Sequence, residues 1–254
     1  MKTLNKEMQA SITPRKALEI LKEGNTRFIN NLKAHRNLLE QVNDTRDGQW
    51  PFAIILSCID SRTSAELIFD QGLGDIFSVR IAGNIVNTDI LGSMEFACKV
   101  AGSRLIIVLG HSKCGAVKGA CDHVEMGNLT ELLSKIQPAV YQEIETKEER
   151  NASNATFVEN VAEINVKRSV KNIIERSYVL EQMIAKGEIG IVGAMHNIET
   201  GEVNFYNDVK WYFPKMKNGQ LLTVPLHDGP NPPCAYFVKE VSRQSEILQL
   251  DKVL

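Results

Sequence analysis

Short runs of branched apolar residues, separated by helical patterns, constrain the fold of this chain more than any other feature. Three runs span residues 52–57, 77–81 and 104–110, and a fourth spans 189–195. Runs of this length and composition are typical of parallel strands that are buried on both faces. Helical patterns lie between and after the first three, over residues 62–71, 90–102 and 115–122. This alternation predicts an α/β fold, with a central, mainly parallel β-sheet flanked by helices.

The flanking segments complete the predicted organisation. Thr13 and Pro14 are typical of the start of a helix, which we expect over residues 14–31. A helical hairpin is expected over 128–145 and 156–186, and an edge strand over 202–206. Beyond residue 207 the pattern is interrupted by Pro225, Pro230, Pro232 and Pro233, before a last helical pattern at 237–250. We predict one domain over residues 1–254, composed of an N-terminal helical arm (1–50), a catalytic α/β core (51–206) and a C-terminal extension (207–254).

The composition excludes several classes of protein. The 254 residues include 29 Lys and Arg against 31 Asp and Glu, a net charge of -2, so we expect no nucleic-acid partner. No uninterrupted apolar stretch approaches the ~18 residues that a membrane span needs, so no membrane partner is expected either. Residues 1–13 are polar and lack the apolar centre of a secretory signal. These features predict a cytoplasmic protein.

Two of the strand ends carry groups that bind metals. Cys58 follows the first predicted strand, and His111 and Cys114 follow the third. Open α/β sheets place their sites at the carboxyl ends of strands. If these two strands are neighbours, two thiolates and one imidazole converge, and such a set with a fourth open position is expected for catalytic zinc. The other cysteines, Cys98, Cys121 and Cys234, lack ligand-like neighbours and are expected to be non-ligands.

Each part of this pattern is weak alone, because a single Cys58 or Cys114 is more often a small core residue than a ligand. The joint occurrence of both groups with Asp60 and Arg62 makes the combination specific. A structural ion pair is the alternative for Asp60 and Arg62.

The combined pattern resembles the β-class carbonic anhydrases, whose zinc signature is Cys-x-Asp-x-Arg followed further along by His-x-x-Cys. Here His111 follows Cys58 by 53 residues, and the likeness covers roughly residues 14–205, including Val79-Arg80-Ile81-Ala82-Gly83-Asn84. The resemblance implies a zinc lyase with one Zn²⁺ per chain, held by Cys58, His111 and Cys114, that interconverts carbon dioxide and bicarbonate. It also implies an active site shared across the interface of a homodimer, with dimers able to pair into tetramers.

The residues around the signature resemble the plant-like subgroup of that family. Gln49 stands nine residues before Cys58, at the position of a substrate-contacting Gln. Ile55 stands where a bacterial group with a regulatory bicarbonate site has Trp, so no such site is expected. The other pocket residues that the resemblance implies are Phe77, Ala82, Phe96 and the backbone N–H of Gly115. Core packing is the alternative for both phenylalanines.

The resemblance also implies a mechanism, in which zinc-bound hydroxide attacks carbon dioxide and releases bicarbonate and a proton. Asp60 would accept a hydrogen bond from the bound water, and Arg62 would hold the carboxylate. The proton shuttle is not assigned among His35, His123, His196 and His227. Two alternatives stay open: a hydrolase of carbon disulfide or carbonyl sulfide at the same zinc, and a zinc-binding relative without turnover.

Overall fold

The central element of the structure is a five-stranded sheet with the order β2-β1-β3-β4-β5. The computed structural model describes residues 3–206, 215–217 and 220–222 of the chain. The first four strands in this order run parallel, and β5 is antiparallel to β4. Their bounds are β1 Ala53–Ser57, β2 Ile76–Arg80, β3 Leu105–His111, β4 Gly190–His196 and β5 Val203–Phe205. The predicted fold class is therefore confirmed.

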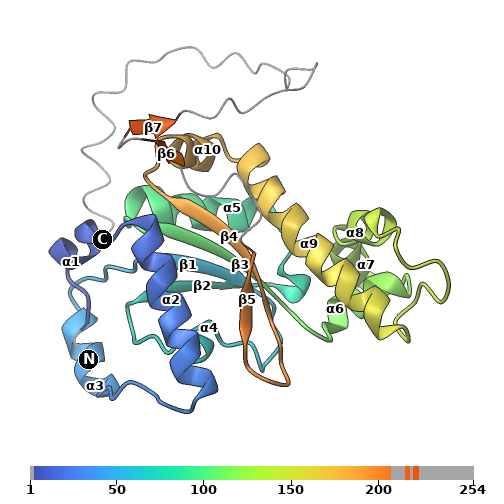
Figure 1. The fold of residues 1–254 in the computed structure, drawn as a ribbon, viewed down its shortest axis with the longest axis horizontal. Helices are drawn as coiled ribbons and strands as arrows, with labels where there is room; N and C mark the ends of the chain where they lie inside the picture. The colour runs from blue at the N-terminus through green and yellow to red at the C-terminus, as the bar shows by residue number, and fades with distance from the viewer. Residues whose placement is uncertain (1–2, 207–214, 218–219, 223–254) are drawn as a thin grey trace.

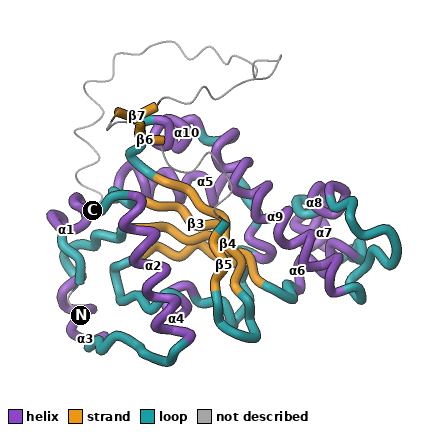
Figure 2. Tube along the Cα trace, viewed as in Figure 1, coloured by secondary structure: helices purple, strands orange, loops and turns teal. Residues whose placement is uncertain are grey.

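Helices flank this sheet on both sides, as Figures 1 and 2 show, with α2 crossing its front face and the long α9 packed against β3 and β4. The helices are α1 Lys6–Ser11, α2 Pro14–Ile29, α3 Leu38–Thr45, α4 Ala65–Ile68, α5 Thr88–Glu95, α6 Gly115–Cys121, α7 Gly127–Ser134, α8 Gln137–Gln142, α9 Ala155–Arg176 and α10 Tyr178–Ala185. A 3₁₀ turn covers Ala82–Asn84, and a π-helical turn, Phe96–Val100, extends α5. A separate two-stranded sheet pairs β6 Lys215–Lys217 with β7 Gln220–Leu222.

Several predicted helices have different bounds in the structure. The helix expected over 62–71 is reduced to α4. On its N-terminal side, the backbone N–H of Thr63 donates to the carbonyl of Asp60 in a turn; on its C-terminal side, Asp70 has a positive φ of 45°. The predicted hairpin is four helices: Lys135 ends α7, and Ser177 ends α9 and caps α10. The helix expected at 237–250 lies outside the described residues.

Two hydrophobic clusters form the interior. The larger covers both faces of the sheet and includes almost all of β1 and β3, together with Leu21 of α2 and Val166 of α9. The smaller fills the lobe of α6, α7, α8 and the first half of α9, which lies at the right of Figure 1. Cys58 and Cys114 belong to this second cluster. The two cysteines thus lie where the lobe meets the sheet.

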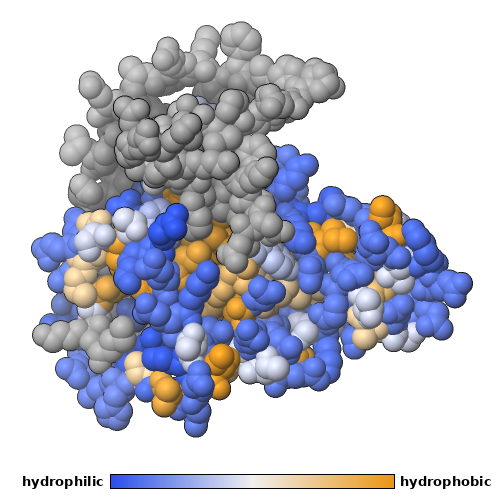
Figure 3. All heavy atoms as spheres, viewed as in Figure 1, coloured by the Kyte–Doolittle hydropathy of each residue, from blue (hydrophilic) through white to orange (hydrophobic). Residues whose placement is uncertain are grey.

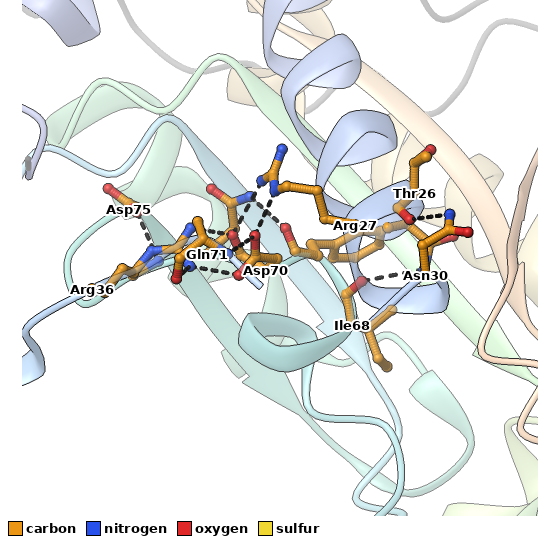
Figure 4. A network of polar contacts seen from close by, with 12 residues as sticks. Thr26, Arg27, Asn30, Arg36, Ile68, Asp70, Gln71 and Asp75 are labelled. Carbon is orange, nitrogen blue, oxygen red and sulfur yellow. Dashed lines mark hydrogen bonds and ion pairs between the residues drawn. The ribbon is translucent and has the colours of Figure 1, made fainter. Parts of the chain in front are cut away.

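A buried ionic network ties the N-terminal helices to the core (Figure 4). The carboxylate of Asp70 accepts hydrogen bonds from Arg27 Nε of α2 at 2.5 Å, from Arg36 Nη1 at 2.5 Å and from the backbone N–H of Ala34 at 3.1 Å. Burial by itself would raise the pKa of Asp70, but the bonds from Arg27, Arg36 and Ala34 hold it below its usual value. The α2–α3 segment is thereby fixed against the turn that precedes β2.

Among the described residues, no helix has both the length and the apolar character needed to cross a lipid bilayer. On the face drawn in Figure 3 the surface is mainly hydrophilic, with small apolar patches at the lower end of α2 and on the α6–α8 lobe.

Candidate active site

Three buried side chains converge at one edge of the sheet. Cys58 directly follows β1, His111 ends β3, and Cys114 directly precedes α6. Because β1 and β3 are parallel neighbours, with Ser57 opposite Leu109, their carboxyl ends lie side by side. One ligand atom from each residue lies within 4.8 Å of the other two. The structure therefore brings together the three residues predicted as metal ligands.

The two sulfur atoms are close but not bonded to each other. Cys58 Sγ and Cys114 Sγ are 4.0 Å apart, about twice a disulfide bond length. The neighbouring Cys114 thiol lowers the pKa of Cys58, and the same contact together with burial raises the pKa of Cys114. The pair therefore loses its first proton more readily than its second, and a cation that attracts thiolates would displace both.

The imidazole of His111 is oriented for coordination. Its Nδ1 lies 2.9 Å from the carbonyl oxygen of Ser112, which fixes Nδ1 as the protonated nitrogen. Its Nε2 is buried and has no hydrogen-bond partner within the part of the chain that the structure describes. A buried nitrogen lone pair beside two sulfur atoms fits the donor set of a tetrahedral Zn²⁺ site that keeps one position open. The residues present thus fit zinc.

Backbone and side-chain contacts hold Cys58 and the loop that follows it. The N–H of Gly83 donates to Cys58 Sγ at 3.4 Å. Arg80 Nε donates to the carbonyl of Cys58 at 3.0 Å, and its Nη2 donates to that of Asp60 at 2.6 Å. Arg80 and Gly83 were not among the predicted site residues, although both lie in the segment 79–84 that resembles the family. The family resemblance of this segment could have indicated them, but only the fold shows that the segment contacts Cys58.

Asp60 and Arg62 form the predicted pair at the rim of the cluster. Arg62 Nε donates to Asp60 Oδ1 at 2.9 Å, and its Nη2 donates to Oδ2 at 2.7 Å. The backbone N–H of Arg62 adds a third bond to Oδ1 at 3.0 Å. The hydrogen bonds from Arg62 hold the pKa of Asp60 well below its usual range. The carboxylate is therefore charged and is held by Arg62, outside the three-residue cluster.

The two predicted pocket phenylalanines lie together, but they line a different cavity. The rings of Phe77 and Phe96 meet edge to face with their centroids 6.5 Å apart. They line a cavity of about 540 Å³ between β2 and α5 whose lining includes none of Cys58, His111 and Cys114. Phe96 is 38% exposed, so the alternative of plain core packing does not describe it.

The remaining predicted pocket residues differ in where they lie relative to the cluster. Ala82 is half-buried and opens the 3₁₀ turn whose Gly83 contacts Cys58. Gly115 is exposed at the first position of α6, and a Cβ placed there would meet nothing within 4 Å. Gln49 is exposed in the segment between α3 and β1 and has no hydrogen bond to the cluster. Within one described chain, the structure does not bring Gln49 to the cluster.

The other cysteines and histidines that the structure describes lie outside the cluster. Burial raises the pKa of Cys98 to about 12 and that of Cys121 to about 11, as expected for inert thiols. Cys234 and His227 lie outside the described residues. His196 is opposite His111 on β4 and is 3% exposed, with no partner for either ring nitrogen among the described residues. Burial, with a further effect of His111, lowers the pKa of His196 to about 4.

Comparison with known proteins identifies the family. The model of the family described as carbonic anhydrase matches residues 53–203, which include the whole cluster. The chain belongs to the carbonic anhydrase family. Carbonic anhydrase 2 of Mycobacterium tuberculosis is 35% identical over 194 residues, which cover 74% of this chain and 90% of that protein.

Solved structures agree with this assignment. The β-carbonic anhydrase CcaA superposes with a TM-score of 0.58 at 27% identity, covering 77% of this chain and 98% of CcaA. A tetrameric β-carbonic anhydrase from Sordaria macrospora shares the fold, with a TM-score of 0.56 at 24% identity over 66% of this chain and 90% of its own. This carbonic anhydrase is thus of the β class, a lyase that uses zinc to interconvert carbon dioxide with bicarbonate and a proton.

Proposed function

We propose that Cys58, His111 and Cys114 are the three protein ligands of the catalytic zinc. The convergence of their ligand atoms within 4.8 Å, in a buried position at the carboxyl ends of β1 and β3, is the observation that carries the proposal. The free Nε2 of His111 supports it, because a buried nitrogen without a partner is otherwise unfavourable. When bound, zinc lowers the pKa of a coordinated water and supplies the nucleophile for carbon dioxide.

Asp60 and Arg62 act on this water as a pair. With zinc bound, the Asp60 carboxylate would accept a hydrogen bond from the coordinated water and so orient it for attack on carbon dioxide. Arg62 holds both carboxylate oxygens in its planar fork, which keeps Asp60 charged and fixes its direction. The side chain of Asp60 is 16% exposed, so it is accessible from the rim of the site. The N–H of Gly115 is available to the oxygen of the substrate, and Ala82 supplies part of the apolar wall.

Gln49, Phe77 and Phe96 complete the pocket of a second copy of the chain. Their separation from the cluster within one chain supports this arrangement, because side chains that line a substrate pocket must reach the reacting atoms. Exposed apolar residues support a homodimer too: Leu38, Leu39 and Val42 are 57%, 73% and 49% exposed on the single short helix α3. The active site is then complete only in the dimer, and pairs of dimers form a tetramer, as in the Sordaria relative.

The remaining parts of the proposal are one domain over residues 1–254 and a cytoplasmic location. The unpaired cysteines at positions 58, 98, 114 and 121 support a reducing compartment. The net charge of -2 supports the absence of a nucleic-acid partner.

Metal analysis combined with stopped-flow carbon dioxide hydration tests the ligand assignment. The parent protein is expected to bind one zinc per chain and to hydrate carbon dioxide. Cys58→Ser, His111→Ala and Cys114→Ser are each expected to lose zinc and activity together, whereas the control Cys98→Ala keeps both. Full zinc occupancy in all three variants would overturn the assignment, and hydrolysis of carbonyl sulfide without carbon dioxide hydration would overturn the substrate.

A further inference from the structure

The loop His111–Cys114 carries two of the three proposed ligands, and neighbouring elements hold it. The backbone N–H of Ser112 donates to the carbonyl of His196 at 2.9 Å, and the N–H of Ile198 donates to Ser112 Oγ at 3.0 Å. These bonds attach the first half of the loop to the end of β4. Lys113, the next residue, makes the bend that brings Cys114 back toward His111.

Lys113 makes this bend in an unfavourable backbone conformation. Its φ is 56°, in the left-handed region, where the Cβ of any residue other than glycine crowds the following carbonyl oxygen. Another contact must therefore hold Lys113 in this conformation. The side chain of Lys113 pairs with Glu199 at 2.5 Å, but these side chains are 51% and 64% exposed, and such surface pairs contribute little.

The stronger contact is made by Glu159 of α9. Its Oε1 accepts a hydrogen bond from the backbone N–H of Lys113 at 2.7 Å, which is the short distance typical of a bond to a charged acceptor. Glu159 is half-buried, and α9 is packed on β3, so the carboxylate is carried by a rigid element. The bond acts on the backbone itself, between the two ligands of the loop.

We propose that Glu159 is a positioning residue for zinc, which holds Lys113 in its left-handed conformation and thereby sets the spacing of His111 and Cys114. The inference rests on the proposed ligand set. Without the carboxylate, Lys113 relaxes toward negative φ, and Cys114 Sγ moves relative to His111 Nε2. Contacts that orient metal ligands in this way commonly account for about 10-fold to 100-fold in metal affinity.

Zinc dissociation into a chelator, followed with the purified holoenzyme, tests the proposal. Glu159→Ala is expected to release zinc about 10-fold faster or more. Glu159→Gln keeps an oxygen that accepts the N–H, so its rate is expected between those of the parent and Glu159→Ala. Glu163→Ala is the matched control, because Glu163 lies one helical turn further along α9 and pairs with the exposed Lys167. It is expected to release zinc at the parental rate.

A rescue variant separates positioning from a general effect on stability. Glycine adopts positive φ without strain, so adding Lys113→Gly to Glu159→Ala is expected to slow zinc release toward the parental rate. The cobalt-substituted proteins give a second readout, since a shifted ligand changes the visible absorption bands in Glu159→Ala and the double variant restores them. Thermal unfolding of the zinc-free forms is measured alongside.

The outcomes are distinct. A parent protein that binds no zinc would overturn the ligand set, and this inference with it. A parent that binds zinc, with Glu159→Ala releasing it no faster, would overturn the role of Glu159 alone. Faster release that Lys113→Gly does not reverse, in a Glu159→Ala protein of lowered thermal stability, would show that Glu159 only stabilises the fold.

Discussion

Asp60 stays charged beside the cluster because Arg62 supplies both a bidentate side-chain contact and a backbone N–H. Asp60 and Arg62 are two positions apart in one turn, so the geometry of the pair depends little on distant parts of the chain. Arg80 adds a second fixed point by holding the carbonyl of Asp60. The carboxylate is therefore oriented before a substrate arrives.

Removing this carboxylate is expected to slow hydration without releasing zinc. Asp60→Ala leaves the three proposed ligands intact but takes away the acceptor that orients the attacking water, so kcat/KM should fall about 100-fold. Stopped-flow hydration with metal analysis of the same sample checks this. An Asp60→Ala enzyme as fast as the parent would show that the carboxylate has no role in the reaction.

Gly83 is a second residue whose replacement has a defined consequence. Its φ is 66°, and a Cβ added to it would lie 2.5 Å from Cδ1 of Ile136. Strain and overpacking together are expected to lower the free energy of unfolding of Gly83→Ala by about 3 kcal/mol. Denaturant unfolding of the zinc-free protein measures this, with Gly92→Ala as control, because a Cβ there meets nothing within 4 Å. Equal stability of the two variants would contradict the packing described.

Among single residues, the sequence predicts site residues that lie close together in the chain, and few of those that lie far apart. Cys58, Asp60 and Arg62 form one local motif, and His111 and Cys114 another, so their spacing carries their chemistry. Glu159 contacts Lys113 from 46 residues away. No local pattern marks such a contact, because it depends on how α9 crosses β3.

At the scale of the elements, the Asp70 network joins three segments that the sheet alone does not hold. Arg27 belongs to α2, Arg36 to the segment before α3, and Asp70 to the turn that follows α4. The side chains of Arg36 and Asp70 are only 7% and 5% exposed, so solvent screens the pair little. The network thus fixes the arm that carries the exposed apolar face of α3.

Asp70→Asn is expected to destabilise the zinc-free protein by about 3 kcal/mol near neutral pH, because it removes the buried negative charge that Arg27 and Arg36 both contact. The folded pKa of Asp70 lies below that of an unfolded Asp, near ~3.9. Its contribution is therefore complete above this value and is lost as the pH falls through the folded pKa. Denaturant unfolding from pH 7 to pH 3 should show the difference between parent and variant shrinking in acid.

The exposed pair of Arg46 and Asp47 provides the control for this comparison. Asp47→Asn is expected to change the unfolding free energy little at any pH, because its side chain is 85% exposed. A difference between parent and Asp70→Asn that stays constant down to pH 3 would contradict the titration of Asp70.

The strands were predicted more accurately than the helices. Each predicted parallel strand matches an observed one within one residue at each end, because burial on both faces requires an unbroken apolar run. The helix expected over 156–186 is two helices, because the side chain of Ser177 caps a new start by accepting a bond from the N–H of Leu180. Helical periodicity continues across such a break, so the pattern alone does not reveal it.

At the scale of the whole molecule, the proposed active site requires two chains. The cluster lies at the carboxyl ends of the inner strands β1 and β3, whereas the cavity of Phe77 and Phe96 lies between β2 and α5. β2 is an edge strand, so this side of the sheet is open to a partner. The family resemblance led to this expectation, which composition and hydrophobic periodicity alone do not indicate.

Charge on α3 is expected to separate the chains. Leu39→Glu with Val42→Glu places two carboxylates on the proposed interface, so sedimentation at assay concentration should show monomers that keep zinc but lose most of the hydration activity. Met126→Glu, at an exposed apolar residue of the α6–α8 lobe, is the control and should leave the dimer intact. A fully active monomer would contradict the shared site.

Zinc K-edge X-ray absorption of the purified protein tests the proposal that two cysteines and one histidine hold the zinc. We expect two sulfur atoms at about 2.3 Å, one imidazole nitrogen at about 2.0 Å and one further light atom around each zinc. The spectrum of Glu163→Ala should be identical. A shell of nitrogen and oxygen alone, or one of four sulfur atoms, would contradict the assignment of Cys58, His111 and Cys114.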